Sequence, residues 1–171
     1  MKTLKHNLFS LAGIAILIFL DQYTKQLAIL HLKGRASFVL IDRILEFSYL
    51  ENTGAAFSSF SGRQTFLITL TILVIILLAW RFFSLPVSGR LIWVRLCLLF
   101  ILSGAVGNLI DRMSRRYVVD FIYFVPINFP KFNVADIYIT IGVAVLAVLM
   151  LFFYSDEECG KVLSIDYLIR K

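Results

Sequence analysis

Long apolar stretches dominate the chain and alternate with short polar segments. Four of them, at residues 8–30, 65–83, 91–110 and 137–154, carry few charges. Each is about long enough to cross a hydrocarbon core of ~30 Å as a helix that rises 1.5 Å per residue. The pattern therefore predicts four membrane-spanning helices within a single membrane domain, residues 1–171.

The segment between the first two spans, residues 31–64, has a different pattern. Its "SFVLI" and "LEFSYL" runs favour strands, and the second run roughly alternates polar and apolar residues. The predicted fold is thus an all-α membrane protein with four transmembrane helices and a small β-rich cradle between helices 1 and 2. The charged segment 155–171 is expected to be a solvated cytoplasmic tail.

An even number of spans places both ends of the chain on one side of the membrane. The connections 31–64 and 111–136 then share the other side, together with the polar ends of the spans that they join. Lys2 and Lys5 precede the first span and favour a cytoplasmic N-terminus. We therefore expect both connections to be extracytoplasmic.

Composition agrees with a membrane protein and narrows its partners. The 171 residues are 60% hydrophobic and 16% charged, with a mean hydropathy of +0.86. The net charge of +6 suits anionic lipid head groups, whereas the scattered basic residues form no nucleic-acid motif. Cys97 and Cys159 have no neighbours at ligand spacing, so we expect no metal site and no disulfide.

Polar residues gather on the expected extracytoplasmic side. Asp21 and Lys25 are four residues apart and can pair on one helix face, which could also be a purely structural ion pair. The motif "NTGAAF", residues 52–57, places Asn52 and Gly54 just before the second span. An ordinary helix entry with a capping residue would look the same.

The third span ends in "SGAVGNLIDR", residues 103–112. Gly104 belongs to a stripe of small residues that permits close helix packing. Asn108 and Arg112 share a helix face and can reach one target together. Asp111 faces elsewhere and needs another partner. The alternative is simply a polar helix end at the membrane surface.

Two further aspartates follow in apolar surroundings. Asp120 lies in "VVDF", and Asp136 opens the fourth span, where Asn133 can cap the helix. Two carboxyl groups close together at a semi-dry interface share a proton, and such a pair can activate water and polarise an amide. Capping and a surface turn are the alternatives. Spacing alone leaves open which two pair among Asp21, Asp111, Asp120 and Asp136.

Taken in order, the motifs resemble those of the signal peptidase II family, the lipoprotein signal peptidases (peptidase family A8). They are "DQYTK" (21–25), "NTGAAF" (52–57), "GAVGNLIDR" (104–112), "VVDF" (118–121) and "FNVAD" (132–136). The resemblance covers nearly the whole chain. It implies a bacterial inner-membrane aspartyl endopeptidase that removes signal peptides from diacylglyceryl-modified prolipoproteins, cutting just before the lipidated cysteine.

The resemblance also implies roles for individual residues. Asp120 and Asp136 match the catalytic pair. Positions expected to bind substrate or support the site are Asn52, Gly54, Gly104, Asn108, Arg112, Asn133, Asp21, Lys25 and Asp111. Ile137 stands where the family commonly has a small hydroxyl residue, which leaves the support of Asp136 open. We expect a monomer with no cofactor and no metal, with the prolipoprotein and membrane lipids as partners.

Two other functions remain open on the residues alone. A small ion- or proton-coupled transporter would also carry intramembrane acids, but the chain has no internal repeat and its acids gather toward one face. A scaffold could bind partner helices through the glycine-containing third span. Such a scaffold would not need four acids. Cleavage of a lipidated peptide in detergent separates the enzyme from both.

Overall fold

Four long helices form the body of the protein, as predicted. The computed structural model describes residues 2–54, 63–87 and 89–163. The helices are α1 (Lys2–Leu32), α2 (Gln64–Ser84), α3 (Ile92–Arg115) and α4 (Val134–Val148), which continues into the π-helical turn η3 (Leu149–Phe153). All four are long and apolar enough to cross a membrane.

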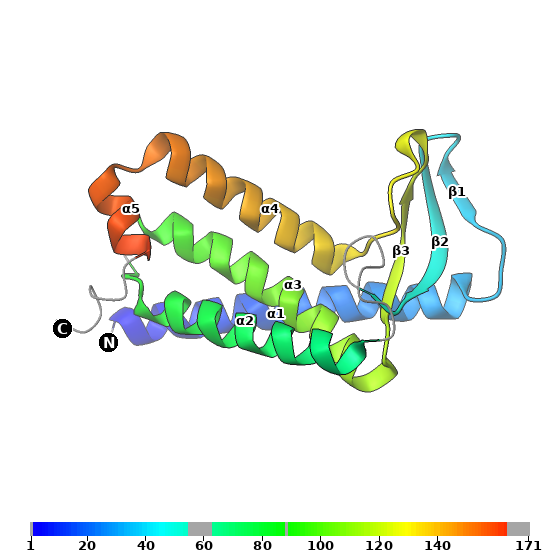
Figure 1. Cartoon of the computed structure of the whole chain (residues 1–171), viewed down its shortest axis with the longest axis horizontal. Coiled ribbons are helices and arrows are strands. Elements are labelled where there is room, and N and C mark those ends of the chain that lie inside the picture. The colour runs from blue at the N-terminus through cyan, green and yellow to red at the C-terminus, as the bar shows by residue number, and fades with distance from the viewer. Residues whose placement is uncertain (1, 55–62, 88, 164–171) are drawn as a thin grey trace.

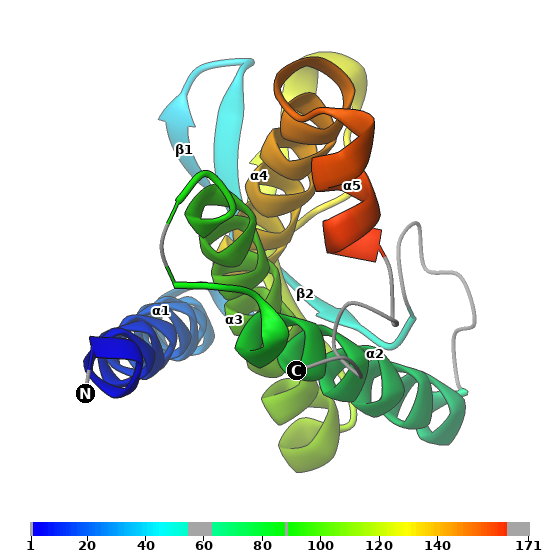
Figure 2. The same ribbon diagram turned by 90° about the vertical axis from the view of Figure 1, so that its left-hand side faces the viewer.

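Helix α3 is the centre of the bundle. It packs against α1, α2 and, most extensively, α4, and Figure 2 shows the other three helices arranged around it. In its most apolar window 56% of the residues are buried, against 6 to 11% in the other three helices. The outer faces of α1, α2 and α4 are therefore available to lipid, while α3 provides the interior contacts.

Small residues set the close approach of α3 and α4. A Cβ added at Gly104 would overlap the carbonyl oxygen of Ala135 and lie 2.7 Å from the side chain of Ile139. Gly142 of α4 has the reciprocal position, where a Cβ would lie 2.7 Å from the side chain of Ile101. The predicted small-residue stripe on the third span is thus a helix-packing surface.

A three-stranded antiparallel sheet lies crosswise at one end of the bundle, and α1 begins at the other end (Figure 1). Strands β1 (Phe38–Ile41) and β2 (Leu45–Asn52) come from the connection between α1 and α2, as predicted. Strand β3 (Val118–Phe124) follows α3, pairs with β2 and leads into the 3-10 turn η2 (Val125–Ile127). The sequence pattern did not predict this third strand.

One face of the sheet packs on the last turns of α1. Val119 and Phe121 of β3 form a buried cluster with Ala28 of α1. The ring of Phe47 on β2 lies 6.2 Å from that of Phe121 and extends the cluster. This packing leaves the opposite face of the sheet open, and the carboxyl group of Asp120 belongs to that face.

The C-terminal segment differs from the prediction of a solvated tail. Asp156–Leu163 forms helix α5, and Val162 is buried in the apolar core at the ends of α2 and α3. Arg81 of α2 donates hydrogen bonds to the carbonyl oxygens of Lys161 and Val162, which have no partner within the last turn of α5. The many charged residues of this segment predicted a solvated tail, so the sequence pattern gave no sign that Val162 is buried. Residues 164–171 lie outside the described part of the chain.

We expect Gly104→Ala to lower the free energy of unfolding by about 1–3 kcal/mol, the usual cost of adding a methylene to a filled site. The overlap involves a backbone carbonyl, which cannot rotate away. Thermal unfolding in detergent measures the loss. Gly13→Ala is the matched control, because its Cβ would meet Leu99 at an ordinary 3.6 Å. Equal losses in the two variants would contradict the packing explanation.

Candidate active site

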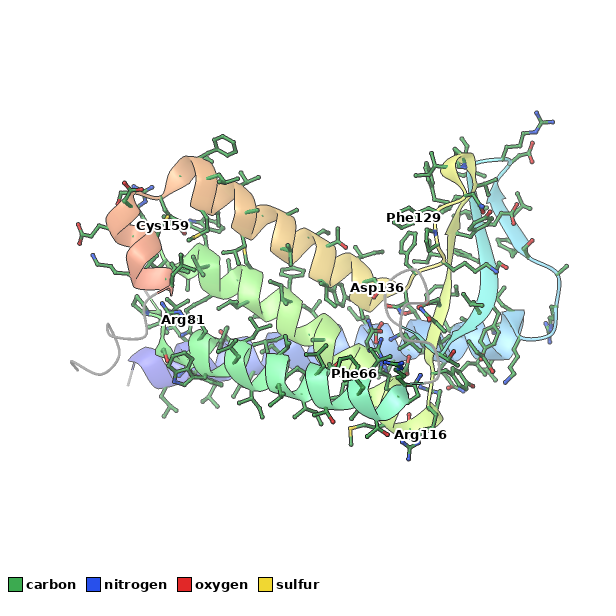
Figure 3. The ribbon with its side chains drawn as sticks, viewed as in Figure 1. Phe66, Arg81, Arg116, Phe129, Asp136 and Cys159 are labelled. Atoms are coloured by element: carbon green, nitrogen blue, oxygen red, sulfur yellow. The ribbon has the colours of Figure 1, made fainter. Side chains whose placement is uncertain are left out.

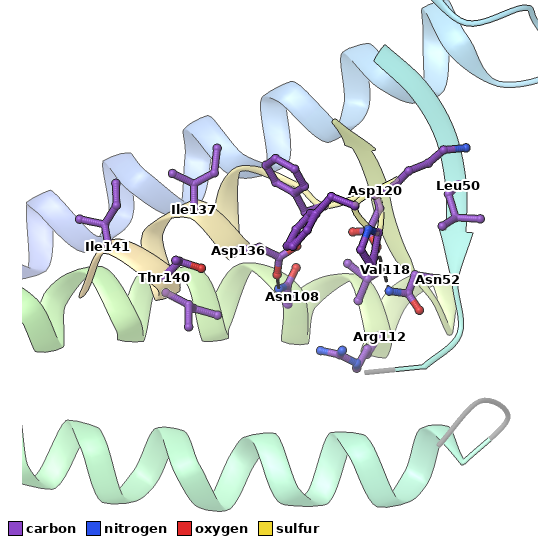
Figure 4. A pocket seen from close by; sticks show the side chains of 15 residues that line it. Leu50, Asn52, Asn108, Arg112, Val118, Asp120, Asp136, Ile137, Thr140 and Ile141 are labelled. Atoms are coloured by element: carbon purple, nitrogen blue, oxygen red, sulfur yellow. Dashed lines mark hydrogen bonds between the residues drawn. The ribbon is translucent and has the colours of Figure 1, made fainter. Parts of the chain in front are cut away.

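A cavity of about 770 Å³ opens where the sheet meets α3 and α4 (Figure 4). Asp120 of β3 and Asp136 of α4 both line it, and Asn52, Asn108 and Arg112 lie around them. The structure therefore brings the two aspartates of the "VVDF" and "FNVAD" motifs to one place. In Figure 3 Asp136 lies at the sheet end of α4, far from Cys159 on α5.

Asp136 is held by the first turn of α4. Asn133 is the N-cap, and its side-chain oxygen accepts a hydrogen bond of 3.1 Å from the backbone N–H of Asp136. In return, Oδ2 of Asp136 accepts one of 3.0 Å from the backbone N–H of Asn133, which completes a capping box. Oδ1 accepts a third bond, of 2.8 Å, from Nδ2 of Asn108. Both carboxylate oxygens of Asp136 thus accept hydrogen bonds, although Ile137 stands where the family commonly has a small hydroxyl residue.

Asp120 is 2% exposed and bound by two amide groups. Its Oδ1 accepts a hydrogen bond of 2.7 Å from Nδ2 of Asn133, and its Oδ2 accepts one of 2.8 Å from Nδ2 of Asn52. The side-chain oxygen of Asn52 in turn accepts a bond from the backbone N–H of Gly54 at 2.9 Å. Asn133 therefore contacts both aspartates and fixes their relative position.

The surroundings of Asp120 favour its protonated form. Burial raises the pKa of Asp120 to about 7, and the nearby negative charge of Asp136 acts in the same direction. The hydrogen bonds from Asn52 and Asn133 favour the ionised form and oppose this rise. Near neutral pH the cavity thus contains one carboxyl group that readily carries a proton, next to a second at a helix N-terminus.

A buried ion cluster supports the cavity from behind. The ammonium group of Lys25 lies 2.9 Å from Oδ2 of Asp21 and 3.0 Å from Oδ2 of Asp111, and none of the three side chains is exposed. Lys25 also donates a hydrogen bond of 2.8 Å to the side-chain oxygen of Asn108. Arg115 pairs with Asp111 as well. The predicted Asp21–Lys25 pair is confirmed, and Asp111 has the further partners that its position required.

The two carboxylates of this cluster also bind backbone next to the cavity. Oδ1 of Asp21 accepts a hydrogen bond of 3.0 Å from the N–H of Ala135. Oδ2 of Asp111 accepts one of 3.2 Å from the N–H of Val119. Ala135 and Val119 immediately precede the two cavity aspartates in the sequence. Sequence reasoning missed both links, because a backbone donor leaves no mark in the pattern of side chains.

Gln22 is a further supporting residue that the sequence did not single out. Its side-chain amide donates to the carbonyl oxygen of Gly107 at 3.1 Å and to Oδ2 of Asp21 at 3.1 Å. A Cβ at Gly107 would overlap the carboxylate of Asp21. Glycine at this position therefore makes room for the ion cluster between α1 and α3.

Arg112 offers donors to the cavity. Helix α3 continues to Arg115, so Asp111 and Arg112 lie in its last turns and not in the connection to which residues 111–136 were assigned. Nη2 of Arg112 donates to the carbonyl oxygen of Gly54 at 3.3 Å, while its buried Nε has no hydrogen-bond partner among the described residues. Residues 55–57 of "NTGAAF" lie outside the described part of the chain. Gly104 belongs to the helix contact and does not line the cavity.

Known proteins are similar to this chain in sequence and in fold. The family model for signal peptidase (SPase) II matches residues 13–152. The chain belongs to the signal peptidase II family. The lipoprotein signal peptidase of Clostridium tetani is 41% identical over 141 residues, which cover 81% of this chain and 89% of the relative. That of Streptococcus pyogenes serotype M5 is 37% identical over 159 residues, which cover 92% and 100%.

A solved bacterial membrane enzyme has the same fold as this signal peptidase II. The two chains superpose with a TM-score of 0.75 at 32% identity, over 85% of this chain and 94% of the other. Together with the four apolar helices, these matches identify a multi-pass membrane enzyme, an aspartic peptidase. The transporter and scaffold alternatives are therefore set aside.

We expect Lys25→Met to destabilise the enzyme by about 3–5 kcal/mol, because it leaves the buried carboxylate of Asp21 without a cation and leaves Asp111 with Arg115 alone. Denaturant unfolding in detergent measures this loss. Lys33→Met is the matched control. It removes a 2.7 Å ion pair with Glu51 whose side chains are 52% and 39% exposed, and we expect a loss of at most about 1 kcal/mol. A loss of similar size in both variants would show that the buried ion cluster contributes no more to the free energy of unfolding than an exposed ion pair does.

Proposed function

We propose that Asp120 and Asp136 are the catalytic pair with which this signal peptidase II removes signal peptides from prolipoproteins. The observation that carries the proposal is their shared cavity, where Asn133 donates to both carboxyl groups. The other two candidate acids, Asp21 and Asp111, are bound to Lys25 and do not line the cavity. This division assigns two acids to chemistry and two to support.

In the proposed reaction the two carboxyl groups play different parts. Asp136, at the N-terminus of α4, acts as the base and takes a proton from a water molecule, which attacks the scissile carbonyl carbon. Asp120 is protonated and hydrogen-bonds to the carbonyl oxygen, which stabilises the developing negative charge. Asp136 then donates the proton that it took from water to the leaving nitrogen, the C–N bond breaks as the carbonyl re-forms, and Asp120 keeps its own proton. The side chain of Arg112 is available to hold the substrate backbone beside the pair.

The proposed substrate is a prolipoprotein with a diacylglyceryl group on the cysteine that follows the cleaved bond. Ile137, Thr140 and Ile141 of α4 line the cavity, so it opens along a helix that faces lipid. The acyl chains and the apolar signal peptide can remain in the membrane while the scissile amide reaches the aspartates. This geometry favours lateral entry from the bilayer.

We place the cavity at the extracytoplasmic face of the bacterial cytoplasmic membrane and both chain ends in the cytoplasm. Support comes from Lys2 and Lys5 at the start of α1, because basic residues before the first span favour a cytoplasmic N-terminus. We propose a monomer, because one chain supplies both aspartates and the three asparagine amides that hold them.

Asp120→Asn and Asp136→Asn should each lower kcat by about 10²–10⁴-fold, the usual contribution of general acid–base catalysis. The measurement is loss of the signal peptide from a diacylglyceryl-modified prolipoprotein in detergent, after unfolding curves confirm that each variant is folded. Asp42→Asn, at an aspartate that is 86% exposed in the β1–β2 turn, is the matched control and should cleave normally. Full activity in either catalytic variant would refute the assigned pair.

The raised pKa of Asp120 predicts a loss of activity at alkaline pH. Above pH 7 or so Asp120 loses the proton that it presents to the carbonyl oxygen, and kcat/KM should fall about tenfold for each further pH unit. A pH profile of the wild-type enzyme checks this. A constant kcat/KM up to pH 9 would exclude Asp120 as the acid.

The same titration affects stability, with a sign that follows from linkage. The pKa of Asp120 is higher in the folded state than the ordinary value of 3.8, so the folded state binds more protons and stability falls as pH rises from about 4 to about 7. Asp120→Asn lacks this component. The stability of the variant relative to wild type should therefore increase across that range, and a constant difference would contradict the raised pKa.

A further inference from the structure

A second hollow continues from the cavity along the open face of the sheet. We call it the outer groove; its volume is about 390 Å³. It is lined by Glu46, Ser48, Leu50, Tyr123, Asn128, Phe129, Pro130 and Lys131. Leu50 and the segment 129–131 line the cavity as well, so the two hollows are contiguous.

The two ends of this path differ in chemistry. At one end α4 contributes Ile137, Ile139 and Ile141 to the cavity, and α4 is one of the membrane-length apolar helices. At the other end the outer groove runs over the sheet, with Glu46 and Ser48 of β2 in its wall. In Figure 3 the sheet lies beyond the end of α4, and the last turns of α1 run beside it. A polypeptide that passes through the cavity thus meets apolar walls on one side and a more polar, mixed wall on the other.

We propose that the outer groove is the subsite for the first residues of the mature lipoprotein, and that Lys131 selects an acidic side chain there. The inference rests on the proposed function. A signal peptide is apolar and matches the α4 end, whereas the mature chain must leave the bilayer for water. The outer groove continues the cavity in that direction, with polar walls suited to the hydrophilic start of the mature chain.

Lys131 lies where it can interact with a charged substrate side chain close to the cleaved bond. Its side chain borders both hollows, and its ammonium group lies 5.8 Å from the centre of the Tyr123 ring. Among the described residues no carboxylate forms an ion pair with Lys131. Glu46 lines the outer groove only and so lies further along the path. The first mature side chain after the lipidated cysteine therefore meets Lys131 before it reaches Glu46.

The test measures kcat/KM for diacylglyceryl-modified prolipoprotein substrates that differ only in the second mature residue, which is Asp, Ser or Lys. We expect the wild-type enzyme to prefer Asp over Lys by about 3- to 10-fold, the size that a partly exposed ion pair and the matching repulsion give. Lys131→Gln should bring the ratio close to one, and Lys131→Glu should invert it.

The control is Arg35→Glu, which reverses an exposed cation that follows α1 and lines neither hollow. It should leave the Asp-to-Lys ratio unchanged. A ratio that Lys131→Gln and Lys131→Glu both leave unchanged would overturn the proposal. If charge reversal abolishes cleavage of every substrate, the ratio of Lys131→Gln decides alone, because this variant introduces no new charge.

A second substrate series tests the direction of binding. It carries the same three residues two positions before the cleaved bond, and Lys131 variants should not change the preference there. A change in this series alone would place the signal peptide in the outer groove and refute the proposal. Failure of the proposed function has a different signature, which is cleavage that survives Asp120→Asn whatever stands at position 131.

Discussion

The buried ammonium group of Lys25 is the interaction on which the rest of the site depends. A charge without partners inside a protein costs several kcal/mol, and Lys25 is tolerated because Asp21, Asp111 and Asn108 all turn oxygens toward it. These partners lie on α1 and α3, so the cluster fixes how the two helices face each other. Such clusters add little net stability compared with an apolar core, and we interpret this one as specifying a single arrangement.

The same cluster explains how two separate elements come to present their aspartates together. The carboxylate of Asp21 binds the backbone of Ala135 at the start of α4, and that of Asp111 binds the backbone of Val119 in β3. Each aspartate of the proposed catalytic pair is thus held in position through the backbone of the residue before it. The spacing of the pair depends on α1 and α3, and the connecting segment 125–132 is left to shape the cavity and the outer groove.

Features that depend on local pattern could be predicted from the sequence, and contacts between distant segments could not. The spans, the ion pair within α1 and the Asn133 cap follow from spacings of four residues or fewer and from long apolar runs. By contrast, Asn52 binds Asp120 from a distant strand, and the pairing of Val118–Phe124 with β2 joins segments that are far apart in the sequence. The motif resemblance singled out Asn52, Asp120 and Asp136 without revealing these contacts, because a resemblance in sequence gives the identity and order of residues but not their distances in space.

The side chains that donate hydrogen bonds to the proposed catalytic pair are neutral, and the proposed mechanism requires this. Three asparagine side chains donate hydrogen bonds to the two carboxyl groups, so they fix position without forcing both to ionise. A lysine or arginine in the same contact would lower the pKa of Asp120 and remove the proton that the reaction needs. The cation Lys25 is instead one step away, bound to the oxygen of the Asn108 amide whose nitrogen reaches Asp136. The Lys25 ion cluster thus fixes where the two aspartates lie, and the neutral amides that contact them allow Asp120 to keep its proton. The proposed mechanism depends on both.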